Sequence, residues 1–272
     1  MTGAIREGMT TTNDAPNASH SLPRIALITG GSRGLGKSMA LHLADAGVDV
    51  ILTYRSGAKE AQEVVAQIAA KGRKAVALAL DVADSRSYGA FAETVKTELA
   101  RTWQRDRFDH LVNNAGTGLH ASFVETTEAE FDDMVNVHLK SVFFLTQKLL
   151  PLIADGGRIL NVSTGLARFS FPGSSAYAAV KGGVEVLTRS MAKELGARKI
   201  AVNVIAPGAI ETDFRGGSVR DNPEINKAVA AQTALGRVGL PDDIGGAVRL
   251  LLAPEAGWIN GQRIEVSGGM VL

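Results

Sequence analysis

The sequence contains no cysteine among its 272 residues. This absence excludes disulfide bonds, thiolate metal ligands and a cysteine nucleophile. It also fits a reducing compartment, so we expect the protein to be cytoplasmic. A chain of this length buries about 75% of the surface that its unfolded form exposes, and it therefore needs no covalent cross-links to fold.

Long apolar runs and an excess of one charge are also absent. No stretch approaches the ~20 apolar residues that span a bilayer, so we predict no membrane segment. The 29 basic and 28 acidic residues are spread along the chain and give a net charge of +1. Without a basic block, nucleic acid is not an expected partner. The scattered His42, His110 and His120 lack metal-ligand spacing, so we predict no metal site.

The first 21 residues are rich in Thr, Asn, Ser and Gly and lack an apolar core. We interpret residues 1–21 as a disordered tail rather than a secretory signal. The alternative is an arm that packs on a partner subunit. Residues 22–272 show no internal repeat and no linker-like composition, which predicts one domain.

From residue 24 onward, apolar β-type runs alternate with helical patterns. The expected strands are Arg24–Thr29, Asp49–Tyr54, Lys74–Leu80, His110–Asn113, Arg158–Ser163, Ile200–Ile205 and Arg263–Val266. Helices are expected near 35–46, 58–71, 85–101, 128–150, 175–197 and 241–252. Continuous apolar strands imply burial on both faces, and the alternation predicts an α/β fold with a doubly wound parallel sheet.

Two segments are interpreted separately. Residues 209–236 form a long excursion after an expected strand, and such connections are usually functional, so we predict a substrate lid there. The alternative is an ordinary surface insertion. Trp103 lies in the charged stretch 101–107, which we interpret as an exposed loop.

A glycine-rich loop, Thr29-Gly-Gly-Ser-Arg-Gly-Leu-Gly36, joins the first expected strand to a helix. Glycines allow a tight turn and a close approach to a pyrophosphate, and the helix N-terminus supplies free N–H groups. This context predicts a dinucleotide site. The residues expected to line it are Gly30, Ser32, Arg33, Gly34, Leu35 and Gly36.

The end of the second expected strand indicates which dinucleotide binds. An NAD site needs an acidic residue there for the ribose 2′-hydroxyl, whereas an NADP site needs a cation for the 2′-phosphate. The sequence reads Tyr54-Arg55-Ser56, with Tyr54 at the position expected for the acid. Arg33 is a second cation that could reach the same phosphate. The sequence therefore favours NADP(H) over NAD, unless both arginines are merely solvated.

Tyr177 and Lys181 lie one helical turn apart and share a helix face. A lysine ammonium beside a phenol favours the phenolate, so we expect the pKa of Tyr177 to fall from roughly 10. Such a tyrosine can give a proton to a carbonyl oxygen or take one from an alcohol.

Over about residues 24–272 the chain resembles the short-chain dehydrogenase/reductase family, in its 3-oxoacyl-(acyl carrier protein) reductase-like branch. The motifs that carry the resemblance are Thr29–Gly36, Asp81-Val82, Asn113-Asn-Ala-Gly116, Tyr177-x3-Lys181, Pro207-Gly208 and Ser267-Gly-Gly269. It implies a seven-stranded Rossmann sheet, a nicotinamide cofactor, and hydride transfer between that cofactor and a carbonyl or alcohol carbon of a small molecule. It also implies a homodimer or homotetramer built on the helices near 128–150 and 175–197.

The resemblance also implies roles for single residues. Asp81 and Val82 should meet the adenine, and Lys181 should bond the nicotinamide ribose. The stretch after Pro207 should hold the carboxamide, and Tyr177 should be the general acid. The implied cofactor contacts in this part of the chain are Asp81, Val82, Asn113, Ala115, Gly116, Tyr177, Lys181, Pro207, Gly208, Ile210 and Thr212.

The sequence departs from the family pattern at the residue that holds the substrate oxygen. The family has a serine thirteen residues before the tyrosine, where this chain has Thr164. Ser163 is the alternative, and because strand neighbours point to opposite faces, only one of the two can face Tyr177. The spacing favours Thr164, whose extra methyl predicts a sterically tighter site.

His138 stands where the family has a helical asparagine. Thr127 and Glu130 form a capping-box pattern at the helix start, and His138 falls on the apolar stripe from Phe131 to Leu149. Asn136 falls on the wetter face. His138 is either a satisfied core residue or an anchor for a water chain to Lys181, which would make that relay sensitive to pH near 6–7.

The resemblance leaves the substrate open. Binding of an acyl carrier protein would need basic residues near the site, for which Arg168, Arg215 and Arg220 are candidates. The alternatives are a non-catalytic NADP-binding sensor, an NAD-dependent alcohol, sugar or steroid dehydrogenase, and an isomerase or epimerase of the extended relatives.

Overall fold

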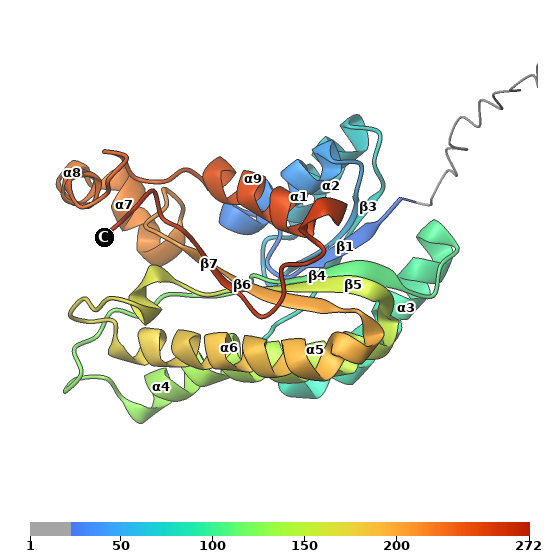
Figure 1. Ribbon diagram of the computed structural model, residues 1–272, viewed down its shortest axis with the longest axis horizontal. Helices are drawn as coiled ribbons and strands as arrows, with labels where there is room; N and C mark the ends of the chain where they lie inside the picture. Colours follow the sequence, from blue (N-terminus) through green and yellow to red (C-terminus); the bar gives the residue numbers. More distant parts are fainter. Residues whose placement is uncertain (1–22) are drawn as a thin grey trace, which may run out of the picture.

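The computed structural model describes residues 23–272, so the expected tail at 1–21 lies outside the described residues (Figure 1). Seven parallel strands in this part form one sheet in the order β3-β2-β1-β4-β5-β6-β7. The strands are β1 (Ile25–Ile28), β2 (Asp49–Tyr54), β3 (Ala75–Ala79), β4 (Phe108–Asn113), β5 (Ile153–Val162), β6 (Ala201–Pro207) and β7 (Arg263–Val266). This order confirms the predicted doubly wound α/β fold.

Strand β1 shows why continuous apolar runs belong in such a sheet. Ile25 and Leu27 pack into one core, and Ala26 and Ile28 pack into the other, all with 0% exposure. Successive side chains of a strand point to opposite faces, so an unbroken apolar run fills two cores at once. Helices must therefore cover both faces of the sheet.

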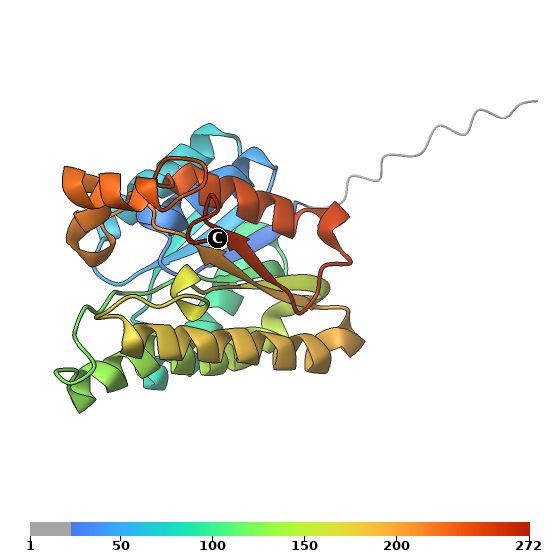
Figure 2. The same cartoon turned by 60° about the vertical axis from the view of Figure 1, so that its left-hand side comes forward.

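The helices form two layers, one on each face of the sheet (Figure 1). One layer contains α1 (Gly34–Asp45), α2 (Ala58–Ala70) and α9 (Pro241–Leu252), and the other contains α3 (Tyr88–Glu98), α4 (Glu128–Met134), α5 (Ser141–Leu149) and α6 (Ser175–Glu194). Figures 1 and 2 show α7 (Ser218–Asp221) and α8 (Pro223–Ala231) at one end of the molecule, beyond the sheet. Short 3-10 or π-helical turns occupy Ser85–Ser87, Leu99–Trp103, Val135–Lys140, Leu150–Leu152, Gly165–Ala167, Leu195–Arg198, Phe214–Gly217 and Pro254–Ala256. Within residues 23–272, no helix has the length and apolar content to cross a bilayer.

The helix expected over 128–150 is continuous but changes its winding. A π-helical segment, Val135–Lys140, separates α4 from α5. The capping box of Thr127 and Glu130 is present, which confirms the predicted helix start. The predicted apolar stripe is wrong at its first residue, because Phe131 is 43% exposed, whereas Leu145 and Leu149 are buried. The first turn of α4 therefore faces outward.

The interpretation of Trp103 as part of an exposed loop is wrong. Its side chain is only 8% exposed, and its Nε1 donates a hydrogen bond of 2.8 Å to Asp49 Oδ2. Asp49 is a buried carboxylate at the start of β2, and Arg73 Nε lies 3.1 Å from its other oxygen. Since a buried charge needs paired or hydrogen-bonding partners, this carboxylate explains why Trp103 turns inward.

The strand order reverses direction between β1 and β4, which are neighbours in the sheet but are separated by β2 and β3 in the chain. Loops that leave the carboxyl ends of such neighbours run in opposite directions and leave a crevice between them, where ligands bind in open α/β sheets. The glycine-rich loop follows β1, and the Asn114–Gly116 segment follows β4.

Candidate active site

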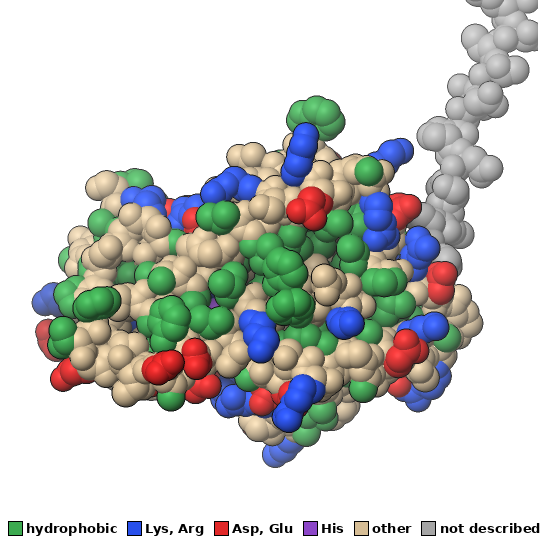
Figure 3. Space-filling model, turned by 90° about the horizontal axis from the view of Figure 1, so that it is seen from below, with side chains coloured by type: hydrophobic (Ala, Val, Ile, Leu, Met, Phe, Trp, Pro, Cys, Tyr) green, Lys and Arg blue, Asp and Glu red, His purple; other side chains and the backbone are tan. Residues whose placement is uncertain are grey.

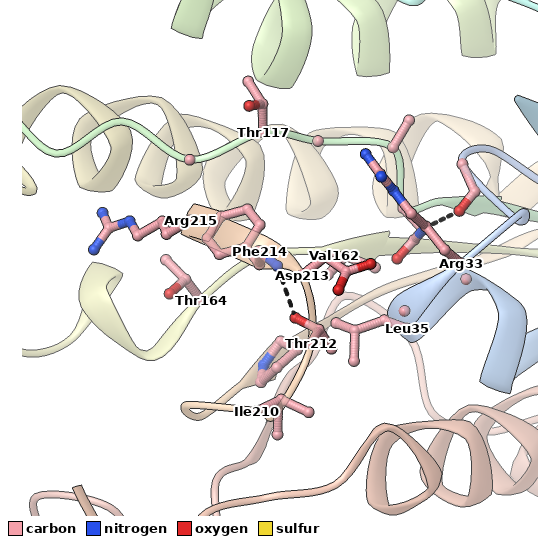
Figure 4. A pocket seen from close by; sticks show the side chains of 18 of the residues that line it. Arg33, Leu35, Thr117, Val162, Thr164, Ile210, Thr212, Asp213, Phe214 and Arg215 are labelled. Carbon is pink, nitrogen blue, oxygen red and sulfur yellow. Dashed lines mark hydrogen bonds between the residues drawn. The ribbon is translucent and has the colours of Figure 1, made fainter. Parts of the chain in front are cut away.

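A cavity of about 790 Å³ lies at the carboxyl ends of the strands. It extends from the glycine-rich loop to the segment that precedes α7, as Figure 4 shows for 18 of its lining residues. The cofactor residues expected from the sequence line it with one exception, Asn113. Those that line it are Gly30, Ser32, Arg33, Gly34, Leu35, Gly36, Tyr54, Arg55, Ser56, Asp81, Val82, Ala115, Gly116, Tyr177, Lys181, Pro207, Gly208, Ile210 and Thr212. His138, Ser163 and Thr164 line the same cavity.

Asn113 lies away from the cavity, which corrects the position expected for it. Its side chain is buried and donates hydrogen bonds to Thr146 Oγ1 at 3.0 Å and Asn161 Oδ1 at 2.8 Å. It therefore joins β4 to β5 and α5. Its neighbour Asn114 lines the cavity and donates to the backbone oxygens of Thr29, at 2.8 Å, and Gly30, at 3.1 Å. Since Thr146 belongs to α5, the Asn113 side chain points into the layer of that helix.

The glycine-rich loop has the shape that a pyrophosphate needs. Gly30 and Gly34 have positive φ angles of 68° and 54°. A Cβ on Gly36 would lie 2.1 Å from the carbonyl oxygen of Gly30, so the turn closes only without a side chain there. No side chain caps the N-terminus of α1 in the described part of the chain. The N–H groups of its first turn therefore remain available to an anion, which fits a dinucleotide phosphate.

The same end of the cavity carries two arginines. Arg33 and Arg55 are both exposed, and within residues 23–272 neither forms an ion pair with a carboxylate. Tyr54 and Ser56 lie beside Arg55 in the lining. Glu60, in the first turn of α2, is a carboxylate in the same part of the lining.

Tyr177 and Lys181 project from α6 into the cavity and are 7% and 4% exposed. Lys181 Nζ donates a 2.7 Å hydrogen bond to the carbonyl oxygen of Val162 and lies 5.8 Å from the centre of the Tyr177 ring. Burial lowers the pKa of Lys181 to about 7. Burial also raises the pKa of Tyr177 to about 12, and the charge of Arg215 and the hydroxyl of Thr164 only partly oppose this rise. The expected fall in the Tyr177 pKa is therefore wrong for this structure, because desolvation dominates.

Thr164 and Ser163 follow β5 in extended backbone and point in different directions, as successive residues of an extended chain do. The Ser163 hydroxyl donates a 2.7 Å hydrogen bond to Glu185 Oε1, near the middle of α6. The Thr164 hydroxyl lies close enough to Tyr177 to lower the pKa of the phenol, and it accepts a 3.3 Å hydrogen bond from the Leu166 N–H. Figure 4 shows Thr164 beside Phe214 and Arg215.

Thr164 is also held through its backbone. Arg263 donates from Nη2 to the carbonyl oxygen of Thr164 at 3.2 Å and from Nε to Glu185 Oε1 at 2.8 Å. Its Nη1 donates to Glu265 at 2.8 Å, and Arg168 pairs with the same carboxylate. This buried-to-surface network fixes the loop after β5 against β7.

His138 lies in the π-helical segment and is 1% exposed. Its Nε2 donates a 2.8 Å hydrogen bond to the carbonyl oxygen of Thr117, and its ring meets that of Tyr177 edge-on, with centres 5.2 Å apart. Its Nδ1 is buried and has no hydrogen-bond partner among the described residues. Burial, and next the charge of Lys181, lower the pKa of His138 to about 3. The expected sensitivity of this residue to pH near 6–7 is therefore wrong, because the folded protein holds the ring neutral.

We expect His138 to make the fold sensitive to acid. Its folded-state pKa of about 3 is below the roughly 6.5 of an unfolded histidine, so the unfolded chain binds more protons between these values. Stability should therefore fall as the pH drops through this window, by up to ~1.4 kcal/mol per pH unit for each such histidine. His110, whose pKa burial lowers to about 4, contributes in the same direction.

Urea unfolding of the wild type and of His138→Asn at several pH values between about 6.5 and 5 measures this effect. The unfolding free energy of the variant should show about half of the pH dependence of the wild type, because His110 still contributes its part. An unchanged slope of stability against pH would contradict the neutral, buried state of His138.

The structure adds cavity residues that the sequence reading did not assign to it. Phe169 and Phe171 come from the loop after Thr164, Phe214 from the turn before α7, and Met270 from the C-terminal segment. Arg215, which the sequence offered as a candidate for binding an acyl carrier protein, also lines the cavity. Apolar residues in loops carry no periodic signal, so only the fold brings them together.

Comparisons with known proteins give consistent matches over nearly the whole chain. The family model described as enoyl-(acyl carrier protein) reductase matches residues 30–271. The hydroxynaphthalene reductase-like protein Arp2 of Metarhizium brunneum is 38% identical over 264 residues, which cover 91% of this chain and 95% of that protein. The 3-oxoacyl-[acyl-carrier-protein] reductase FabG of Staphylococcus aureus is 36% identical over 253 residues, covering 92% and 99%.

Comparison with solved structures gives matches of the same kind. The promiscuous reductase LugOII, which catalyses keto-reduction at C1 during lugdunomycin biosynthesis, has a TM-score of 0.87 and 36% identity, covering 92% of this chain and 99% of that chain. The angucycline C-6 ketoreductase LanV with bound NADP also has a TM-score of 0.87, with 34% identity, and covers 92% and 96%.

Proposed function

This chain belongs to the short-chain dehydrogenase/reductase family and is a reductase acting on carbonyl or alcohol carbons, and we propose that it is an NADPH-dependent ketoreductase of bulky, largely apolar ketones. One observation carries the proposal. The glycine-rich loop that fits a dinucleotide opens into the same cavity as Tyr177, Lys181 and Thr164. A cofactor and a carbonyl compound can therefore meet beside the proton donor.

The protonation state of the site favours reduction. A Tyr177 phenol with a pKa of about 12 stays protonated at neutral pH and can donate its proton to a carbonyl oxygen. Thr164 steadies that oxygen with its hydroxyl, and Lys181 orients the nicotinamide ribose. When bound, the cofactor supplies the hydride for the carbonyl carbon. Because burial gives Lys181 a pKa of about 7, any negative charge that develops on the tyrosine favours the lysine's charged form.

Other residues hold the cofactor in this proposal. Arg33 and Arg55 bind the 2′-phosphate, since arginine matches phosphate geometry. Asp81 and Val82 meet the adenine, and the stretch from Pro207 to Thr212 holds the carboxamide. Two solved relatives contain NADP or NADPH, the ketoreductase LanV and a blue fluorescent protein from a metagenomic library, which supports the choice of NADPH.

The lining at the end of the cavity away from the glycine-rich loop supports an apolar, ring-bearing substrate. Its apolar side chains come from the loop after β5, the segment before α7, helices α7 and α8, and the C-terminal segment. They are Leu166, Phe169, Phe171, Phe214, Val219, Val229 and Met270. We assign residues 209–236 as the lid over this end, because Val219 and Val229 of that segment line the cavity. The names of the hydroxynaphthalene reductase-like and angucycline relatives agree with ring ketones.

An acyl carrier protein is a weaker fit as the substrate carrier. Arg168 pairs with Glu265, and Arg220 pairs with Asp213 and Asp221, so two of the three arginines considered for this contact already have acidic partners. The third, Arg215, faces the cavity.

Oxidation of NADPH in the presence of 2-tetralone, acetophenone or an acetoacetyl thioester tests the function. The bicyclic ketone should give a kcat/KM at least about tenfold above that of the thioester, because apolar burial contributes on the order of 25 cal/mol per Å². Preference for the thioester would contradict the substrate class. Failure to oxidise NADPH with any of the three would contradict the ketoreductase itself.

We also propose that the protein is a homo-oligomer through its α5–α6 face. Figure 3 views this side of the molecule and shows hydrophobic side chains gathered between charged ones. Phe143, Phe144 and Val186 are 45%, 42% and 56% exposed. Contiguous exposed apolar side chains usually mark an interface, and a two-fold axis would place each helix pair against its copy.

Replacing Phe143 and Phe144 with glutamate should convert the oligomer to a smaller species, because like charges would be buried at the centre of the interface. Sedimentation velocity measures the change. Phe123→Glu is the matched control, since Phe123 is 83% exposed but lies in the loop before α4. A wild type that sediments as a monomer, or a double variant with unchanged mass, would contradict the proposed face.

A further inference from the structure

Arg215 enters the substrate end of the cavity from an unusual backbone conformation. Its φ is 52°, and Gly216 and Gly217 follow with φ of 69° and 76°. A left-handed conformation is unfavourable for a residue with a side chain and persists where the surroundings impose it. The Arg215 side chain that leaves this turn lines the cavity.

The surroundings of Arg215 form a built site. Its Nη2 donates to the carbonyl oxygen of Leu119 at 2.7 Å and to Ser174 Oγ at 3.3 Å. The guanidinium carbon lies 5.7 Å from the centre of the Tyr177 ring. A Cβ on Gly118 would come within 2.5 Å of Arg215 Cγ, so this glycine leaves the space that the arginine fills.

The guanidinium keeps unused donors. Arg215 Nε is buried and has no hydrogen-bond partner in the described part of the chain. Within residues 23–272 no carboxylate lies near enough to pair with it, in contrast to Arg168 and Arg220. A partly buried cation without an anion costs free energy, so the position of this guanidinium beside Tyr177 fits an anionic ligand.

We propose that Arg215 binds an acidic oxygen of the substrate, a carboxylate or an ionised phenol, while the ketone oxygen lies at Tyr177 and Thr164. This inference rests on the proposed function and adds a chemical class to it, namely ring ketones that carry an acidic group. Arginine suits such an oxygen because its planar fork donates two parallel hydrogen bonds.

The site differs from that of the cofactor phosphates. Figure 4 shows Arg33 beside the glycine-rich loop and Arg215 on the other side of Thr212 and Asp213. The ring of Phe214 lies next to Arg215 in the same view, and its centre is 5.9 Å from that of Tyr177. A flat apolar body could therefore lie on Phe214 with its acidic group at Arg215.

Calorimetric titrations of the enzyme saturated with NADP⁺ test this assignment without needing turnover. The probes are naphthalene-2-carboxylate against its methyl ester, and 2-naphthol above its ionisation pH against 2-methoxynaphthalene. The wild type should bind at least one anion about tenfold or more tighter than its neutral partner. Which pair shows the larger preference distinguishes a carboxylate from a phenolate.

The variants connect this preference to Arg215. Arg215→Gln should remove the preference and leave affinity for the neutral probes within about threefold, and Arg215→Lys should retain part of it because the charge remains. Arg220→Gln is the control, since it removes the same charge from the same segment, and it should retain the preference.

Equal binding of acid and neutral partner by the wild type, or an unchanged preference in Arg215→Gln, would overturn the proposal. A separate titration with NADPH distinguishes its failure from that of the proposed function. Normal NADPH binding without anion preference would overturn only the role of Arg215. If Arg215→Gln cannot bind NADPH because the segment is disturbed, Arg215→Lys decides, since a preference below that of the wild type supports the role of Arg215 and a preference equal to it overturns that role.

Discussion

Replacing Tyr177 with phenylalanine should lower kcat for ketone reduction by about 10³-fold, within the range expected for loss of a general acid. The phenyl ring keeps the edge-on contact with His138, so the cavity should keep its shape. NADPH affinity should therefore change less than about threefold, which corresponds to well under 1 kcal/mol. Steady-state turnover and a titration that follows nicotinamide fluorescence measure the two quantities.

Tyr88→Phe is the matched control for this substitution. Tyr88 is 1% exposed, and its hydroxyl donates to the backbone oxygen of Val82. Removing that hydroxyl should lower stability by about 1 kcal/mol and leave kcat nearly unchanged. If Tyr177→Phe kept the kcat of the wild type, Tyr177 would not be the general acid, and another group would have to donate the proton.

Replacing both Arg33 and Arg55 with alanine should weaken NADPH binding about 100-fold or more and change NADH binding little. Each arginine–phosphate interaction is charge-assisted, and such hydrogen bonds contribute about 1.5–3 kcal/mol. NADH lacks the 2′-phosphate, so it should not sense the loss. Dissociation constants of both cofactors, measured for the wild type, each single variant and the double variant, give the result.

Arg107→Ala serves as the control, because Arg107 is exposed but lies outside the cavity lining. Glu60 is the residue that would favour NADH instead of NADPH. As a carboxylate beside Arg55 in the lining, it could accept a hydrogen bond from a ribose 2′-hydroxyl. Equal or tighter binding of NADH by the wild type would indicate that Glu60, rather than the arginines, selects the cofactor.

The parts of the fold that could be predicted depend on local pattern. The apolar run of β1 fills both cores, and that double burial is why its continuity predicted a parallel sheet. The capping box at Thr127 involves residues three apart, and Tyr177 and Lys181 share one helix. In each case a short stretch of sequence contains the whole physical reason.

The parts that could not be predicted depend on contacts between distant residues. Trp103 is buried because Asp49, 54 positions earlier, needs a donor. The inward turn of Arg215 depends on Gly118 and Leu119, which lie on another loop. The pKa values of Tyr177, Lys181 and His138 follow from burial, which spacing along the chain does not reveal.

The most direct test of the central claim is to trace the hydride during reduction of a ring ketone such as 2-tetralone. NADPH that carries deuterium in both hydrogen positions of the nicotinamide C4 and equally labelled NADH are supplied in parallel, and mass spectrometry of the alcohol locates the label. We expect one deuterium on the former carbonyl carbon, formed faster with labelled NADPH than with labelled NADH and about 10³-fold more slowly in Tyr177→Phe. Unlabelled alcohol, equal rates with both cofactors, or undiminished labelling by the variant would contradict it.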